Sequence, residues 1–188
     1  MSGAVAGADG KLRCPWALSA PEYVDYHDSE WGRSLSTDQA MFERLTLEAF
    51  QSGLSWLVIL RKRDGFRKAF DDFDLEKVAG YGPDDVDRLL ADAGIVRNRA
   101  KIEAAIGNAR AALDLDGGLL KHVSKAAPRG RRKAPQGLGE VPAASPESQA
   151  LAKDLRKRGF RFVGPTTLYA LFQATGLVND HLADCFRR

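Results

Sequence analysis

The segment VNDHLADCFRR places a histidine and a cysteine four residues apart, at His181 and Cys185. The chain holds only two cysteines and three histidines. The other cysteine and a second histidine lie near the N-terminus, Cys14 in RCPW and His27 in YHDSEW. A spacing of four predicts that His181 and Cys185 lie on one face of a helix. Thiolate and imidazole bind soft metals, so the two pairs are candidate ligands of one ion. Buried cysteines without a metal are the alternative.

A second candidate site is the apolar stretch LTLEAFQSGLSWLVIL, in which Glu48 is the only charged residue. One interpretation is a surface ion pair between Glu48 and Arg44, four residues earlier. The other is a carboxylate at the floor of an apolar pocket, where it selects a cationic ligand or acts as a base. The sequence also supplies aromatic side chains that are either core residues or stacking surfaces: Trp16, Tyr23, Tyr26, Trp31 and Trp56.

Two basic regions point toward a polyanionic partner more clearly than the net charge of +3 does. Residues 121–133 hold six Lys or Arg and no acid, and they are either a solvated loop or an arm that contacts nucleic acid. In LRKRGFRFVGPTTLYAL, two predicted helices flank a turn with Gly159 and Gly164 near its ends. Such a turn can direct backbone N–H groups at a phosphate, with Arg161 nearby; an ordinary helical hairpin is the alternative.

The elements that position these residues are predicted to be almost entirely helical, because most periodic stretches have a helical repeat. We expect one all-α domain of eight to ten helices over residues 1–188, with residues 1–12 flexible and 121–145 a basic loop rich in Pro and Gly. No apolar run is long enough to span a membrane, and MSGAVAGADGK lacks the features of a secretory signal. We therefore expect a cytoplasmic protein without a structural disulfide.

The sequence combines one acid among aromatic residues with a basic surface. This combination is typical of a protein that binds a nucleobase flipped out of nucleic acid, stacks it on aromatic faces and recognises it by a hydrogen bond. Six motifs extend this interpretation: RCPW, YHDSEWG, LEAFQSGLSW, DAGIVRNRAKI, RGFRFVGPTT and GLVNDH. In this order and spacing, over residues 13–185, they resemble the 3-methyladenine DNA glycosylase I family. The resemblance implies a helix-hairpin-helix glycosylase fold with a zinc clasp that joins the N- and C-terminal segments. A structural Zn²⁺ would be held by four matching residues: Cys14, His27, His181 and Cys185.

The resemblance also implies the activity and its partners. The chain would be a monomer that binds double-stranded alkylated DNA, flips 3-methyladenine and hydrolyses its N-glycosidic bond in base-excision repair. No lysine stands out as a Schiff-base nucleophile, so we expect no strand cleavage. The methylated base is cationic and a good leaving group, which lets a carboxylate and aromatic faces select it by charge. Two rivals are a zinc-stabilised DNA-binding module without activity, which would need no pocket acid, and a hydrolase with catalytic zinc, which four protein ligands disfavour.

The resemblance assigns roles to individual residues. Glu48 would contact the methylated base as the catalytic residue, and Asp180 in VNDH stays an alternative carboxylate. The base-binding residues would be Tyr26 and Trp56, with Trp16, Tyr23 and Trp31 near them. Leu54 would be the wedge that fills the gap left by the flipped nucleotide. The other DNA-binding positions would be Gly53 and Ser55 beside the wedge, and Gly159, Arg161 and Gly164 in the hairpin.

Overall fold

The computed structural model describes residues 3–130 and 132–188, and this part of the chain is mostly helical. The α-helices are α1 (Pro21–Ser29), α2 (Asp38–Gln51), α3 (Trp56–Ala69), α4 (Leu75–Ala79), α5 (Pro83–Ala91), α6 (Arg99–Leu113), α7 (Leu119–Ala126), α8 (Pro146–Lys157) and α9 (Pro165–Ala174). Three short 3-10 helices add η1 (Pro15–Ser19), η2 (Asp71–Phe73) and η3 (Leu138–Glu140). The strands β1 (Val5–Ala6) and β2 (Leu12–Arg13) pair antiparallel, with Val5 opposite Arg13 and Ala6 opposite Leu12. None of the described helices is long and apolar enough to cross a bilayer.

Capping side chains begin several of the helices. The Thr37 side chain accepts a hydrogen bond from the Ala40 N–H at the start of α2. The Asp74 side chain caps α4 in the same way, and Ser145 caps α8. Each cap satisfies an N–H that the first turn leaves without a helical partner. These helix starts are therefore encoded within four residues of sequence.

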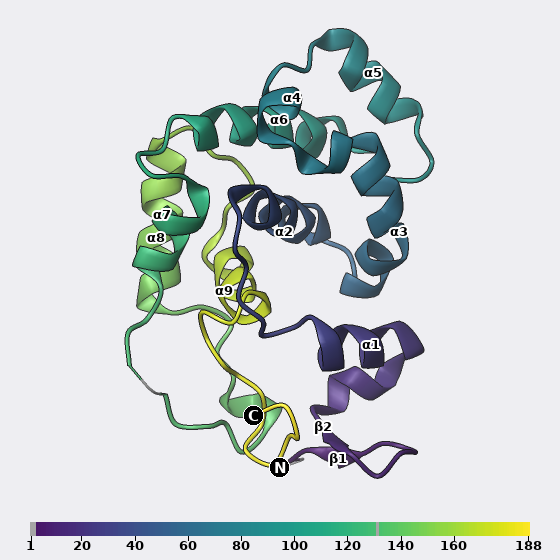
Figure 1. Cartoon of the computed structure of the whole chain (residues 1–188), viewed down its shortest axis with the longest axis vertical. Helices are drawn as coiled ribbons and strands as arrows, with labels where there is room; N and C mark the ends of the chain where they lie inside the picture. The colour runs from purple at the N-terminus through teal and green to yellow at the C-terminus, as the bar shows by residue number, and fades with distance from the viewer. Residues whose placement is uncertain (1–2, 131) are drawn as a thin grey trace.

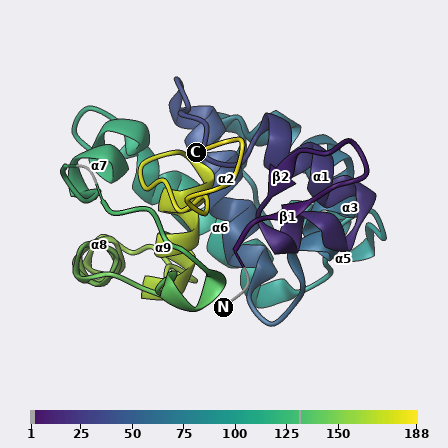
Figure 2. The ribbon, with the colours of Figure 1, turned by 90° about the horizontal axis from the view of Figure 1, so that it is seen from below.

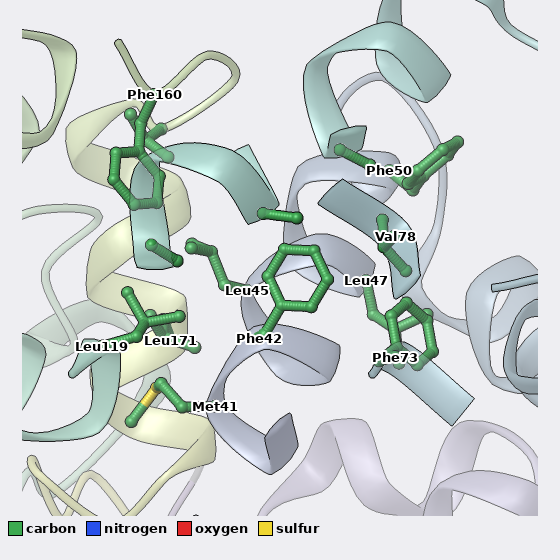
Figure 3. Close-up of a cluster of buried hydrophobic side chains, with 14 of the residues drawn as sticks. Met41, Phe42, Leu45, Leu47, Phe50, Phe73, Val78, Leu119, Phe160 and Leu171 are labelled. Atoms are coloured by element: carbon green, nitrogen blue, oxygen red, sulfur yellow. The ribbon is translucent and has the colours of Figure 1, made fainter. Parts of the chain in front are cut away.

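Helix α2 runs through the middle of the molecule and packs on two sides (Figure 1). In Figure 3, Phe42 lies between two groups of buried side chains that flank α2. One group lies toward α7 and α9: Met41, Leu45, Leu119, Phe160 and Leu171. The other lies toward η2 and α4: Leu47, Phe50, Phe73 and Val78. Because the core holds α2 from both sides, any group at its C-terminal end has a fixed position.

The N- and C-terminal segments meet at one end of the molecule (Figure 1). The Phe186 N–H donates to the Leu12 carbonyl at 2.9 Å, so the last residues attach to β2. Seen from below, the C-terminal segment lies beside α9 and faces the β1–β2 ribbon (Figure 2). The contact joins segments far apart in sequence, and the fold therefore brings the two predicted ligand pairs together.

The structure differs from the sequence-based expectation in three places. His181 and Cys185 do not lie on a helix, because the chain after α9 folds into turns in which the Leu182 N–H donates to the Cys14 sulfur at 3.5 Å. The basic loop expected over residues 121–145 begins later, since α7 buries Leu119 and Val123 on its apolar face. Residues 1–12, expected to be flexible, contribute β1 to the ribbon; residues 1 and 2 of that range lie outside the described chain.

Candidate functional site

A cavity of about 460 Å³ opens between η1, α1, α2, α3 and α9. It is lined by all six residues that the sequence analysis assigned to the base: Trp16, Tyr23, Tyr26, Trp31, Glu48 and Trp56. Five of these residues come from four separate elements and Trp31 from the turn after α1, and only the folded chain places them around one space. The volume lies in the range of small-molecule sites, and the mainly aromatic wall offers stacking surfaces to a flat ligand.

Glu48 lies near the C-terminal end of α2 and is 5% exposed. Burial raises its pKa to about 7, and the charge of Arg44 only partly opposes that shift. Of the two interpretations of Glu48, the surface ion pair with Arg44 is not formed: Arg44 donates to the Tyr26 hydroxyl at 2.8 Å and lies 3.6 Å from Glu30. Within the described chain, no donor hydrogen-bonds the Glu48 carboxylate, which leaves it available to a ligand in the cavity.

The aromatic wall is held in place by contacts behind it. The Tyr26 and Trp56 rings lie 5.5 Å apart, and the Arg44 guanidinium lies 5.3 Å from the first and 5.9 Å from the second. The Tyr23 hydroxyl accepts from the Leu57 N–H at 2.9 Å, which ties α1 to the first turn of α3. These contacts fix the rings before any ligand arrives, so little ordering remains to be done on binding.

Sequence reasoning missed several residues of the cavity: Ser19, Gln51, Leu138, Val141, Ala170 and Gln173. Gln51 follows Glu48 by three residues on α2, so helical spacing was a signal that could have identified it. Gln173 had no such signal, because α9 is distant in sequence. Asp180 also lines the cavity, and its Oδ2 accepts from the Tyr169 hydroxyl at 2.6 Å and from Gln173 at 3.0 Å. Unlike Glu48, Asp180 is therefore already hydrogen-bonded within the protein.

The two predicted ligand pairs form one buried cluster. Ligand atoms of Cys14, His27, His181 and Cys185 all lie within 4.8 Å of one another. The Cys185 sulfur lies 3.4 Å from His27 Nε2 and 3.5 Å from His181 Nδ1, and the Cys14 sulfur lies 3.9 Å from His181 Nδ1. Ligands of a tetrahedral zinc are separated by about 3.5 Å, given Zn–S near 2.3 Å and Zn–N near 2.0 Å. The cluster could therefore hold a metal ion.

Further contacts orient the cluster. His27 Nδ1 lies 2.8 Å from Asp28 Oδ1, which leaves Nε2 facing Cys185, and Arg13 donates to the same carboxylate. A carboxylate behind a histidine is a common support for a metal ligand. Burial lowers the pKa of His181 to about 4 and also lowers that of His27, which favours the neutral ring that metal binding requires.

The cluster and the cavity share a wall. The Trp16 ring lies 5.3 Å from the His27 ring, and the Trp31 ring lies 4.6 Å from the His181 ring. Trp16 and Trp31 also line the cavity. The position of two of the five aromatic lining residues therefore depends on the cluster behind them.

The loop between α2 and α3, residues 52–55, presents the predicted wedge at the rim. Leu54 is 39% exposed, and the lining residues Gln51 and Trp56 flank its loop. Gly53 has φ +80°, a left-handed conformation that favours glycine. Ser55 is the N-cap residue of α3, although its side chain makes no capping bond. The loop thus projects an apolar side chain beside the cavity.

The predicted hairpin joins α8 to α9. Helix α8 ends in a Schellman motif, in which the Phe160 N–H donates to the Leu155 carbonyl at 3.0 Å and Gly159 has φ +92°. Gly164 has φ −74° and is the N-cap of α9, so of the two glycines only Gly159 has a left-handed backbone; Phe162, between them, has φ +57°. Arg161 is exposed in the turn. The exposed Arg161 side chain therefore lies just before the N-terminus of α9, where a phosphate could bind.

The basic segment after α7 is partly turned inward. Arg132 donates to the Tyr169 hydroxyl at 2.6 Å and lies 3.7 Å from Asp180. At least this cation is already engaged with the protein, which argues against a uniformly solvated loop. The expectation for the segment also includes residue 131, which lies outside the described residues.

Comparisons with known proteins agree with this geometry. A model of the methyladenine glycosylase family matches residues 16–188. The chain is 44% identical over 177 residues to DNA-3-methyladenine glycosylase 1 of Escherichia coli (strain K12), covering 92% of this chain and 95% of that protein. A crystal structure of 3-methyladenine DNA glycosylase I has a TM-score of 0.88 at 42% identity, covering 93% and 98% of the two chains. A tyrosine-to-phenylalanine variant of such an enzyme in complex with 3-methyladenine has a TM-score of 0.86 at 34% identity, covering 93% and 96%.

Proposed function

The chain belongs to the methyladenine glycosylase family and is a DNA-3-methyladenine glycosylase, and we propose that it holds the methylated base in the aromatic cavity against Glu48. The observation that carries this proposal is a buried carboxylate that no described residue hydrogen-bonds, in a cavity walled by aromatic rings. An isolated buried charge is costly without a ligand. A cationic purine supplies both the missing charge and the missing hydrogen-bond donor.

The chemistry of the base explains why so few catalytic groups are needed. Methylation at N3 makes adenine cationic and a good leaving group. Aromatic faces and the Glu48 carboxylate attract that cation, whereas a neutral adenine gains neither interaction. Water then replaces the base at the sugar. The lining side chains within the described chain include no lysine, and we therefore propose simple hydrolysis without strand cleavage.

The target nucleotide must leave the duplex to reach this cavity. We propose that Leu54 enters the gap in the base stack, supported on either side by Gly53 and Ser55. The hairpin would hold the DNA backbone through its N–H groups and Arg161, with Gly159 and Gly164 allowing close approach. All of these elements come from one chain, which supports a monomer that acts on double-stranded alkylated DNA.

We also propose that the Cys/His cluster binds a structural zinc ion. The donor set and the sulfur–nitrogen distances fit tetrahedral Cys₂His₂ coordination. The ion would supply a cross-link between the N- and C-terminal segments and would take no part in the reaction. Cys14 and His27 would hold it from one segment, and His181 and Cys185 from the other.

The deciding experiment measures the free bases released from methylated duplex DNA by the wild type and by Glu48→Gln. The variant should keep its fold and its affinity for undamaged DNA, yet release 3-methyladenine on the order of tenfold to a hundredfold more slowly, because an amide loses the charge-assisted interaction. Glu43→Gln is the matched control, since Glu43 lies on the same helix and pairs with Arg67 at 2.8 Å outside the cavity. Equal rates for Glu48→Gln and wild type would contradict the proposed role of Glu48. Wild-type protein that binds DNA but releases no base would instead favour a binding module.

A further inference from the structure

Helix α6 lies behind both elements that are proposed to contact DNA, and two buried polar side chains on it reach them. Lys101 is 8% exposed and Asn108 is 1% exposed, although both are polar. They are separated by about two helical turns, so they lie on nearly the same face, about 10 Å apart along the axis. Neither residue lines the cavity. Buried polar groups at such positions need a structural partner, and each has one in a different loop.

Lys101 binds the chain just before the wedge. Its ammonium donates to the Phe50 carbonyl at 2.8 Å and to the Ser52 carbonyl at 2.6 Å. The first carbonyl belongs to the last turn of α2, where carbonyls lack helical partners, and the second opens the loop that carries Leu54. A cation at a helix C-terminus also interacts favourably with the helix dipole. The Asn98 side chain caps α6 by accepting from the Lys101 N–H at 3.1 Å, which fixes the base of the lysine.

Asn108 binds the hairpin turn through both of its amide atoms. Its Oδ1 accepts from the Arg161 N–H at 2.8 Å, and its Nδ2 donates to the Arg161 carbonyl at 3.0 Å. One side chain therefore satisfies both backbone groups of a residue in the turn between α8 and α9. The Arg161 side chain remains exposed, so the backbone is held while the guanidinium can still meet a phosphate.

We infer that Lys101 and Asn108 are positioning residues that fix the distance between the wedge loop and the hairpin. DNA held by its backbone at the hairpin then presents the methylated nucleotide at Leu54 and the cavity. The inference rests on the proposed function of these two elements. Its physical basis is that a rigid helix spans both contacts, and that a misplacement of about 1 Å far from the chemistry can cost about a hundredfold in rate.

The test compares Lys101→Met with Lys62→Met. Methionine keeps the apolar stem of Lys101 and removes its ammonium. Lys62 is a matched control because its ammonium also donates to a backbone carbonyl, that of Ala93 at 2.6 Å, outside both DNA elements. Lys101→Met should lower single-turnover release of 3-methyladenine from duplex DNA on the order of tenfold to a hundredfold, with free 3-methyladenine binding unchanged. Lys101→Arg should recover most of the rate, because a guanidinium can also donate to two carbonyls.

Coupling to the wedge distinguishes positioning from a general loss of structure. Leu54→Ala should slow the wild type and add little in the Lys101→Met background, since the wedge is already misplaced there. An undiminished Leu54→Ala effect in that background would overturn the inference while leaving the wedge in place. If Leu54→Ala has no effect in the wild type, the wedge proposal fails. The Lys101→Met rate then decides the inference alone, and equality with Lys62→Met overturns it.

A second arm tests the hairpin and decides the matter if Lys101→Met does not fold. Asn108→Asp keeps the acceptor for the Arg161 N–H but places a carboxylate against the Arg161 carbonyl. It should weaken duplex binding and reduce its salt dependence as much as Arg161→Ala does, again without changing free-base binding. If Asn108→Asp binds duplex DNA with wild-type affinity and salt dependence, the inference is wrong.

Discussion

The Cys/His cluster and the aromatic cavity share Trp16 and Trp31 as a wall, yet their buried polar groups are arranged in opposite ways. In the cluster, each histidine faces a cysteine sulfur, and Asp28 and Arg13 support His27 from behind. In the cavity, the Glu48 carboxylate has no hydrogen-bond donor among the described residues. The Trp56 indole N–H is likewise buried without a partner there.

This contrast separates groups that stabilise the fold from groups held ready for a ligand. A satisfied buried cluster adds stability, whereas an unsatisfied one costs stability until a ligand completes it. Active sites commonly carry such a cost, and removing it stabilises the protein while lowering its activity. The comparison therefore predicts opposite effects on stability when each region is altered.

The largest effect is expected in the cluster. Cys185→Ser should remove the metal and leave the protein unfolded or nearly so, because structural zinc binding contributes about 10 kcal/mol or more, comparable to the stability of a whole domain. Elemental analysis and thermal denaturation measure the result. Ala17→Ser, which adds a buried hydroxyl beside Cys14, should cost only about 1 kcal/mol. Folded, active wild-type protein without metal would contradict the zinc assignment.

In the cavity, Glu48→Gln should raise stability, and the gain should depend on pH. The pKa of Glu48 is raised to about 7 by burial, from 4.5, so the folded state holds this proton more tightly than the unfolded state. The stability from Glu48 is thus full below pH 4.5 and is lost as pH rises through 7. The variant should gain on the order of 3 kcal/mol at pH 8 and much less at pH 5. Denaturant unfolding at both pH values measures this, and a gain that is equal at both would contradict the raised pKa.

Trp56→Ala should weaken binding of free 3-methyladenine by about 1 to 3 kcal/mol, through lost stacking. Trp56→Phe keeps an aromatic face and should lose less, which makes it the control for cavity shape. Calorimetry measures both dissociation constants, and circular dichroism checks folding. If the alanine variant binds the base as tightly as the wild type, Trp56 is only a packing residue of the core.

The smallest effect is expected at Thr46, and it tests whether every buried polar group without a hydrogen-bond partner belongs to the base-binding site. The Thr46 hydroxyl is buried on α2 with no hydrogen-bond partner in the described chain, and Thr46 does not line the cavity. Thr46→Val keeps the shape and should stabilise the protein by about 0.5 to 1 kcal/mol. Base release should not change, unlike in Glu48→Gln. A loss of activity would extend the functional site to the far side of α2.

Local features of this fold could be predicted from the sequence, whereas distant contacts could not. Thr37 and Ser145 begin helices because a cap acts within one turn. The spacing of His181 and Cys185 suggested a helix, but contact with the N-terminal segment decides that geometry, and no local pattern encodes it. The two-residue strands are too short for a period-2 signal.

The cavity residues likewise differ in whether local sequence could predict them. Glu48 was identifiable as a lone charge in an apolar stretch, and the family resemblance joined it to the aromatic residues. Gln173 reaches the cavity from a helix more than a hundred residues further along the chain. Lys101 and Asn108 looked like ordinary polar positions of an amphipathic helix, since their partners are backbone groups of other loops.

The two pairs of Cys/His ligands are far apart along the chain, which determines when the cluster can form as the protein is synthesised. Cys14 and His181 are 167 residues apart, and the cavity takes Asp180 from the same late segment. A growing chain therefore carries Glu48 and the wedge long before it can close the ligand set or the cavity wall. A product interrupted before residue 180 lacks two of the four ligands. Such a fragment also lacks Asp180 from the cavity wall, so the wall and the ligand set are completed together, at the end of synthesis.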